Sequence, residues 1–267
     1  MRQFKTQNVT AYSATLGLMQ KMNTSIILKC EGIIRELANR MAGKIVGESF
    51  TAEIIKKLKF DDQNGWNILC SLMDVLSDTE LAKENFLKFG LGGPTKIQDY
   101  GEQYLRLYGI TNAIYLQKSA VFAFIELIKL PNKKKEVERI NNCKLIEFRN
   151  IVGAHTVDYL DNGTINPHQF QRAFIDKYPI RTSDSTNNFK DYNLKELLTE
   201  FNDIIEDILI KSTEKFVKTV LKNGGVKKDK MLEKIEALKT IQDGGLVIWP
   251  DNEEELFIIK IKDARKH

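Results

Sequence analysis

The sequence predicts a mainly helical protein, a helical bundle with additional helices at its N-terminus and small β-hairpin elements. Apolar residues recur every three or four positions through most of the chain, the spacing that lines one face of a helix. Hydrophobic residues make up 42% and charged residues 28%, the balance of a folded globular protein and not of a disordered one. Because no stretch approaches the roughly 18 apolar residues that span a bilayer, we expect a soluble chain with no membrane partner.

The predicted helices are separated by residues that favour turns. Residues 14–46 form a first long helix or two, and a short basic segment at 49–60 leads into the turn-rich residues 61–65. Glycines and a proline then mark the ends of further helices. These core helices share the same apolar spacing and are expected at 66–89, 95–130, 133–160 and 194–221.

Segments outside the core helices carry weaker patterns. Alternating and β-branched residues at 170–181 are consistent with a short hairpin. A charged helix is expected at 228–241. The apolar runs at 246–249 and 256–261 indicate two strands joined around a proline-containing turn.

These patterns divide the chain into three segments. Residues 1–62 form an N-terminal helical segment packed on the core, residues 63–222 form the helical domain, and residues 223–267 form a C-terminal helix and hairpin extension. The first residues are polar and contain no apolar signal segment, so we expect a cytoplasmic protein.

Charge and cysteine content argue against several kinds of site. The net charge of +4 permits an acidic partner but is well short of a nucleic-acid-coating tail. Cys30, Cys70 and Cys143 are widely separated in apolar helical patterns, so we interpret them as core thiols and not as disulfides or zinc ligands. The acidic residues lack the spacing of metal ligands. We expect no metal and no cofactor.

One motif, Arg149-Asn150-Ile-Val-Gly-Ala-His155, contains the residue types that cleave RNA without a metal. Such cleavage needs a base for the ribose 2′-hydroxyl proton, an acid for the leaving 5′-oxygen and a cation for the phosphate. Histidine can take either proton-transfer role near neutral pH, and a guanidinium binds two phosphate oxygens. Arg149, Asn150 and His155 are therefore the candidate catalytic residues.

The spacing of this motif sets a geometric requirement. In a regular helix Arg149 and His155 are about 9 Å apart along the axis, and their side-chain directions differ by roughly 120°. Helical side chains lean toward the N-terminus, which brings His155 back toward the long Arg149 side chain. We expect Gly153 to allow a local bend or bulge that aligns both on one phosphate.

The motif resembles that of the HEPN superfamily, helical bundles in which an arginine, usually followed by a polar residue, precedes a histidine by four to six spacer residues. The likeness covers about residues 63–222, and residues 107–118 also look like bacterial proteins of this kind. It implies a HEPN-like bundle and a homodimer in which two motif copies form one composite, metal-free site for RNA. It further implies a toxin or antiviral role, with an antitoxin or regulatory protein as a partner. Tyr159 departs from the spacing of a tyrosine that is modified in some relatives, so that role is not carried over.

Several basic residues near the start of the motif helix have two interpretations. They would either line an approach for RNA phosphates, or form a solvated helix start with no further role. The residues concerned are Lys133, Lys134, Lys135, Arg139 and Lys144.

Four tyrosines at near-helical spacing are also open to two interpretations. Tyr100, Tyr104, Tyr108 and Tyr115 would stack RNA bases, or they pack in the core or at an interface. His168, next to a proline, is interpreted as a solvated loop histidine and not as a second catalytic base.

The sequence therefore predicts a homodimeric, metal-independent endoribonuclease that acts on single-stranded or loop RNA. Unpaired RNA is favoured because the cleaved ribose must reach an in-line geometry that a duplex resists. One alternative is a catalytically inactive HEPN-like module that binds RNA or a protein partner. Another is a helical adaptor in which residues 100–130 form the interaction face and Arg149 and Asn150 only cross between helices.

Overall fold

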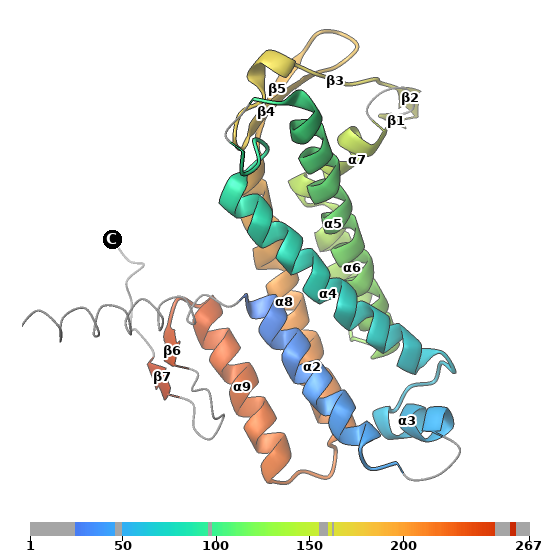
Figure 1. The fold of residues 1–267 in the computed structure, drawn as a ribbon. Coiled ribbons are helices and arrows are strands. Elements are labelled where there is room, and N and C mark those ends of the chain that lie inside the picture. The colour runs from blue at the N-terminus through green and yellow to red at the C-terminus, as the bar shows by residue number, and fades with distance from the viewer. Residues whose placement is uncertain are drawn as a thin grey trace, which may run out of the picture.

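The computed structural model describes residues 25–45, 50–95, 98–154, 160–161, 163–248 and 257–259. Helices dominate this part of the chain, which confirms the predicted mainly helical class (Figure 1). Their bounds are α2 (Ile26–Ala42), α3 (Phe50–Leu58), α4 (Gly65–Phe89), α5 (Tyr100–Leu127), α6 (Lys133–Asn141), α7 (Lys144–Ala154), α8 (Leu194–Val220) and α9 (Val226–Gln242).

Three long helices, α4, α5 and α8, form the centre of the bundle (Figure 1). Helix α5 contacts α4 and α7, and α8 contacts α2, α6, α7 and α9. Four phenylalanines, Phe124, Phe148, Phe201 and Phe216, are fully buried where these helices meet. Each buried aromatic ring contributes about 1.5–3 kcal/mol. These rings therefore hold α5, α7 and α8 together.

The helices on either side of the central segment share its core. Ile34 and Leu37 of α2 and Ile235 and Leu238 of α9 belong to one cluster of buried residues that includes the central helices. The predicted segment boundaries near residues 62 and 222 thus lie within one continuous hydrophobic core. Of the three cysteines, Cys30 and Cys143 are buried as expected, whereas Cys70 is partly exposed on α4.

Polar side chains and one glycine set the ends of the long helices. The Asp99 side chain accepts hydrogen bonds from two amides in the first turn of α5, and Asn193 caps α8 through the amide of Lys195. Gly90 ends α4 with φ of 66°, and a Cβ there would overlap the carbonyl of Lys177. Only glycine fits this position.

A three-stranded antiparallel sheet covers the end of the bundle where α5 and α8 begin (Figure 1). Ile180 pairs with Tyr192 across two of its strands, and both side chains are buried. The Tyr192 ring lies 4.7 Å, centroid to centroid, from the Phe148 ring of α7, which fastens the sheet to the motif helix. The strands, in sheet order, are β3 (Gln169–Phe170), β4 (Pro179–Ser183) and β5 (Phe189–Asn193).

Two short hairpins complete the described part of the chain. The predicted C-terminal strands are present as an antiparallel pair, and the turn between them lies outside the described residues. Residues 14–24 and 46 of the first predicted helix region also lie outside. The remaining strands are β1 (Leu160–Asp161), β2 (Thr164–Ile165), β6 (Leu246–Ile248) and β7 (Phe257–Ile259).

The prediction of one helix at 133–160 is wrong, because two helices, α6 and α7, occupy its first part. The carbonyl of Cys143 accepts hydrogen bonds from the amides of Ile146 and Glu147, so a new helix starts there. Asn141 and Asn142 precede this break, and asparagine side chains compete with the helical backbone for hydrogen bonds. Apolar spacing alone did not indicate the interruption.

Two further predictions need refinement. The predicted hairpin at 170–181 is confirmed in part: Phe170 of β3 pairs with Thr182 of β4 in antiparallel fashion, but Arg172–Phe174 form a turn of 3-10 helix between the two strands, and the longer pairing of β4 is with β5. The polar sequence of Phe189–Asn193 carries no alternating apolar pattern that would have indicated this strand. The helix expected at 95–130 is shorter, because the Asp99 cap begins α5 at Tyr100.

Candidate functional site

Helix α7 presents the first two motif residues at its outer side. Ile151 and Val152 are buried against the bundle, whereas Arg149 is half-buried and Asn150 is exposed. The buried neighbours fix the rotation of the helix and therefore the direction in which Arg149 leaves it. Arg149 is not enclosed in the core, whereas an enclosed and inaccessible Arg149 would have favoured the adaptor alternative.

The Arg149 guanidinium lies over an aromatic ring of the neighbouring helix. Its Cζ atom is 4.3 Å from the ring centroid of Tyr115 on α5, which is a close cation–π contact. Its Nη1 atom donates a weak hydrogen bond of 3.3 Å to Oδ1 of Asn150. Tyr115 and Asn150 together therefore hold the guanidinium at the α5–α7 surface.

Gly153 lies beside the Arg149 guanidinium. Helix α7 continues through Gly153 to Ala154, and the bend or bulge expected between Arg149 and His155 stays a prediction, because His155 lies outside the described residues. A Cβ at Gly153 would lie 3.6 Å from Cζ of Arg149, one helical turn away, which is ordinary van der Waals contact. The glycine therefore leaves this side of the guanidinium uncovered by a side chain at position 153.

Lys118 is a second cation at the same ring, and the sequence analysis did not select it. Its Nζ atom lies 5.2 Å from the Tyr115 centroid and 5.6 Å from that of Phe122, and 3.4 Å from Oδ1 of Asn141. Partial burial lowers the pKa of Lys118, and the nearby charge of Arg149 lowers it further. The signal in the sequence was the spacing of three between Tyr115 and Lys118, which places both on one helix face.

Neither cation is neutralised within the described residues. Arg149 and Lys118 form hydrogen bonds to amide oxygens and contacts with aromatic rings, and no described carboxylate lies within ion-pair distance of either. Two like charges without a counter-ion raise each other's energy, and an anion bound between them relieves that repulsion. The pair is suited to bind a phosphate or a carboxylate.

The third motif residue, His155, lies outside the described residues, as do Tyr159 and His267. Helix α7 ends at Ala154, so the histidine follows directly after its last residue. His168 lies among the described residues, between β2 and β3 and away from α7 in sequence.

The five basic residues proposed for RNA do not gather into one surface. Lys133 pairs with Glu126 of α5 at 2.5 Å, whereas Arg139 pairs with Asp207 of α8, so the two face different neighbours. The Asp207 carboxylate raises the pKa of Arg139 through their hydrogen bond. The other three, Lys134, Lys135 and Lys144, have no carboxylate partner in the described part of the chain.

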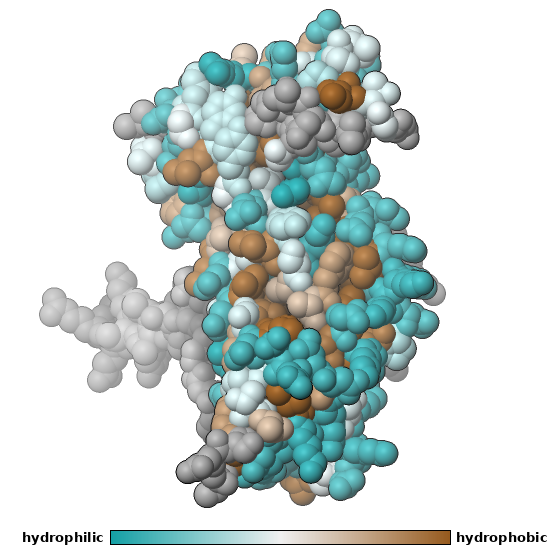
Figure 2. All heavy atoms as spheres, turned by 90° about the vertical axis from the view of Figure 1, so that its right-hand side faces the viewer, coloured by the Kyte–Doolittle hydropathy of each residue, from teal (hydrophilic) through white to brown (hydrophobic). Residues whose placement is uncertain are grey.

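An apolar stripe on α5 runs past the Arg149 guanidinium. Leu105, Tyr108, Tyr115 and Leu116 are all exposed, at 68%, 41%, 39% and 42%. Figure 2 faces the side on which α5 lies and shows brown side chains down its middle with teal side chains on both flanks. Of the other tyrosines, Tyr104 packs against the Phe170 ring. We call the four exposed residues the α5 stripe.

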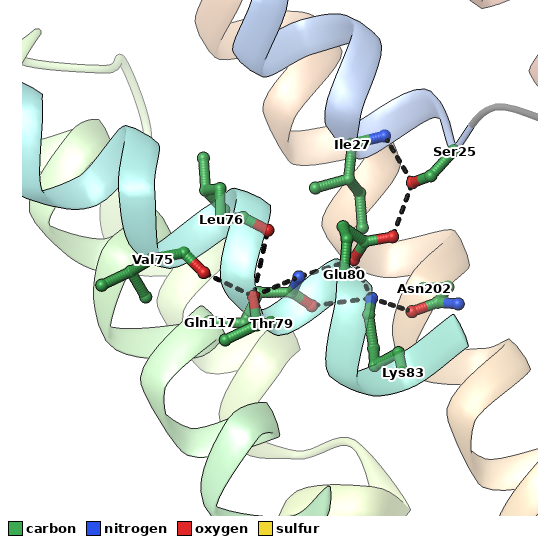
Figure 3. A network of polar contacts seen from close by, with 9 residues as sticks. All are labelled: Ser25, Ile27, Val75, Leu76, Thr79, Glu80, Lys83, Gln117 and Asn202. Atoms are coloured by element: carbon green, nitrogen blue, oxygen red, sulfur yellow. Dashed lines mark hydrogen bonds and ion pairs between the residues drawn. The ribbon is translucent and has the colours of Figure 1, made fainter. Parts of the chain in front are cut away.

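A buried polar network lies deeper in the bundle and was missed by sequence reasoning (Figure 3). Lys83 of α4 is almost fully buried, forms an ion pair with Glu80, and donates hydrogen bonds to Gln117 of α5 and Asn202 of α8 at 2.9 Å and 2.7 Å. Gln117 also donates to Glu80 at 2.7 Å, and Glu80 accepts a hydrogen bond from Ser25 at the start of α2. The network thus ties four helices together.

Burial shifts the pKa values of two groups in and beside this network. It lowers the pKa of Lys83 and raises that of the neighbouring Glu206 to about 7. Because the side-chain oxygens of Glu80, Gln117 and Asn202 are all engaged within the protein, we interpret the network as a structural element that sets helix register. The feature of the sequence that could have indicated this network is the placement of Glu80 and Lys83 on the apolar face of α4.

Comparison with known proteins found no similar protein. No protein-family model, no curated protein and no solved structure matches the chain. None of the helices in the described ranges is long and apolar enough to cross a membrane. In the same ranges no cluster of three or more histidine, cysteine or acidic residues is arranged to hold a metal ion.

Proposed function

We propose that this chain is a metal-independent endoribonuclease of the HEPN type that cleaves single-stranded or loop RNA, in a toxin or antiviral-defence role. One observation carries the proposal. Arg149 and Lys118 share the exposed ring of Tyr115 without a carboxylate partner among the described residues, and Arg149 is on the helix after whose last described residue the motif histidine follows in the sequence. This is a favourable place for one phosphate of an RNA chain.

The roles of the residues follow from the chemistry of the phosphate. The ribose 2′-hydroxyl attacks the adjacent phosphorus, the bond to the 5′-oxygen breaks, and a 2′,3′-cyclic phosphate remains. His155 acts as the general acid or base, and Arg149 stabilises the charge on the non-bridging oxygens. Asn150, which accepts a hydrogen bond from Arg149, orients the guanidinium. Lys118 is added here as a second cation for the same phosphate.

A homodimer would supply the proton-transfer group that one copy lacks. Cleavage needs both a base and an acid, and one motif contains a single histidine. The α5 stripe beside Arg149 exposes two leucines and two tyrosines, residue types that are more often covered than solvated. Pairing two copies along this stripe would bring two motifs together and shield the phosphate from bulk water.

The alternative is a HEPN-like module that binds RNA or a protein without cleaving it. The contact of Arg149 with Tyr115 favours this reading as well, because a cation fixed on an exposed ring binds a phosphate whether or not chemistry follows. The two functions differ only in the chemistry at the 2′-hydroxyl.

Cleavage in the presence of a chelator separates these functions. Purified protein is incubated in excess EDTA with a labelled single-stranded RNA and with the matched DNA, which lacks the 2′-hydroxyl. The proposed nuclease cuts only the RNA and leaves ends with 2′,3′-cyclic phosphate. Binding of both strands with no cut in either identifies the inactive module, and a cut that requires added magnesium contradicts the proposed chemistry.

A further inference from the structure

A basic groove lies between α6 and α8, at the opposite end of the α6–α7 pair from the motif (Figure 1). Its volume is about 750 Å³, and Leu130 and Pro131 form part of its apolar floor. Its walls contain Lys135 of α6, three lysines of α8 and a fourth just after its end, namely Lys211, Lys215, Lys218 and Lys222.

The lysines of the groove lie on one side of α8 and continue past its end. Lys211, Lys215 and Lys218 are four and three residues apart and cover about 10 Å of the helix axis, and Lys222 follows just after α8 ends at Val220. Five lysines and two glutamates line the groove, a net charge of +3. The net charge of the groove is thus nearly as large as the net charge of the whole chain, which is +4.

The two glutamates of the groove each contact one cation of its lining and one outside it. Glu136 contacts Lys211 at 3.7 Å and Arg139 at 3.4 Å, and Glu214 pairs with Lys218 and contacts Lys239 of α9 at 2.8 Å. Lys211 also pairs with Asp207, outside the lining, at 2.8 Å. Each glutamate is therefore shared, and it offsets less of the lysine charge than an exclusive ion pair would. In the described part of the chain, Lys135 and Lys222 have no carboxylate partner at all.

Lys215 is held at the centre of this row. Its Nζ atom donates a 2.5 Å hydrogen bond to the carbonyl oxygen of Ile128, at the end of α5. Burial lowers the pKa of Lys215, and the charge of Lys129 lowers it further. The positive charges here are crowded, which is the condition that a bound polyanion relieves.

We propose that this groove binds the sugar-phosphate backbone of a single-stranded nucleic acid, as a contact separate from the motif. A row of lysines that runs over about 10 Å of α8 and on to Lys222 suits a chain of successive phosphates better than one phosphate group. No aromatic side chain lines the groove, so bases are not stacked there and binding is independent of sequence. The choice of a nucleic acid rests on the proposed ribonuclease function, for which the groove supplies affinity for the substrate.

The test measures binding and does not require cleavage. Fluorescence anisotropy is recorded with a labelled single-stranded DNA, which the proposed chemistry cannot cut, and with the same RNA sequence bound to the His155→Ala protein. A triple variant of the groove, Lys215→Gln, Lys218→Gln and Lys222→Gln, is compared with a matched triple variant at the sheet end, Lys88→Gln, Lys177→Gln and Lys195→Gln, whose lysines are also exposed.

The salt dependence of binding gives the expected result. For single strands, log K falls with log salt concentration by about 0.7 per neutralised phosphate, so loss of three contacts lowers the slope by about 2. The groove variant should show this change with both strands, and the sheet-end variant should keep the slope of the unmodified protein. A Lys218→Gln, Lys222→Gln pair, which keeps the hydrogen bond of Lys215, should lower the slope by about 1.4.

Three results would overturn the proposal. The groove variant could keep the full slope while remaining folded by circular dichroism. The sheet-end variant could lose as much slope as the groove variant, which would indicate nonspecific attraction. The groove could bind vesicles of anionic phospholipid and no nucleic acid, which would assign it to a membrane surface. None of these depends on cleavage, whereas failure of the chelator experiment alone leaves the groove assignment intact.

Discussion

The guanidinium of Arg149 lies 4.3 Å from the centroid of the Tyr115 ring, so that the first residue of the motif is held by a side chain from another helix. The contact fixes a long, flexible cation at the surface before any ligand arrives. Preorganisation of this kind reduces the cost of binding a phosphate. It also makes Tyr115 a positioning residue whose replacement should act through Arg149.

Replacing Tyr115 tests this relationship. Tyr115→Phe retains the ring face and should leave RNA affinity and cleavage nearly unchanged. Tyr115→Leu removes the cation–π contact, worth about 0.5–2 kcal/mol, and should lower the cleavage rate constant at subsaturating RNA by roughly 2- to 30-fold. Single-turnover assays of both variants measure the difference. Equal losses in Phe and Leu variants would show that the hydroxyl, and not the ring face, is what matters.

Lys118 provides a test by pH. Its pKa is lowered by burial and by Arg149, so its ammonium loses its proton at a lower pH than an ordinary lysine does. RNA affinity should therefore weaken on the alkaline side as pH rises through that lowered pKa. Lys118→Arg keeps its charge and should abolish this alkaline loss, whereas Arg149→Gln should move it to higher pH. An unchanged alkaline profile in Lys118→Arg would exclude Lys118 from the anion site.

Lys83 should contribute to stability and not to the chemistry. Lys83→Met leaves the Glu80 carboxylate buried without its cation, which typically costs about 3–5 kcal/mol. Urea denaturation should show this loss, and the further change Glu80→Gln should recover part of it because the stranded charge is removed. Lys88→Met, on the exposed face of the same helix, serves as the control and should change the free energy of unfolding by less than about 0.5 kcal/mol. A loss below 1 kcal/mol for Lys83→Met would show that the network does not hold the helices.

The α5 stripe predicts how the proposed dimer responds to an added charge. Leu116→Lys puts an ammonium into the proposed interface and should shift the protein toward monomer in sedimentation velocity, with a parallel loss of cleavage. Val226→Lys introduces the same charge at an exposed position at the start of α9, a helix that packs on α2 and α8, and should change neither. A dimer of undiminished stability in Leu116→Lys would place the interface elsewhere.

The helical class was predictable because the apolar spacing is strong in α4, α5 and α8, where one face packs on the core. The interruption of a helix and the formation of a strand from polar residues were harder to predict from the sequence. The break at Asn142 interrupts an apolar pattern that continues on both sides of it, and β5 forms from a polar sequence because Tyr192 is buried against α7. Both outcomes depend on tertiary contacts that periodicity does not encode.

For the candidate site, the sequence indicated which residue types to consider but not their partners. Arg149 and Asn150 were selected from the motif, while Lys118 and Tyr115 come from a helix that lies next to α7 only after folding. The basic residues near the start of α6 illustrate the opposite case, because Lys133 and Arg139 form ion pairs with different helices. The basic groove was not predicted, because Lys135 and the lysines at 211–222 are far apart in the sequence and come together only after folding.

The most direct test of the ribonuclease proposal compares two histidines of the same chain. Single-turnover cleavage of a labelled RNA in EDTA is measured for the unmodified protein, His155→Ala and His168→Ala. General acid–base catalysis contributes about 10²- to 10⁴-fold, so His155→Ala should reduce the rate constant by at least 100-fold while RNA binding persists, and His168→Ala should cleave at the unmodified rate. Equal cleavage by His155→Ala and the unmodified protein would contradict the assignment of the motif as the catalytic centre.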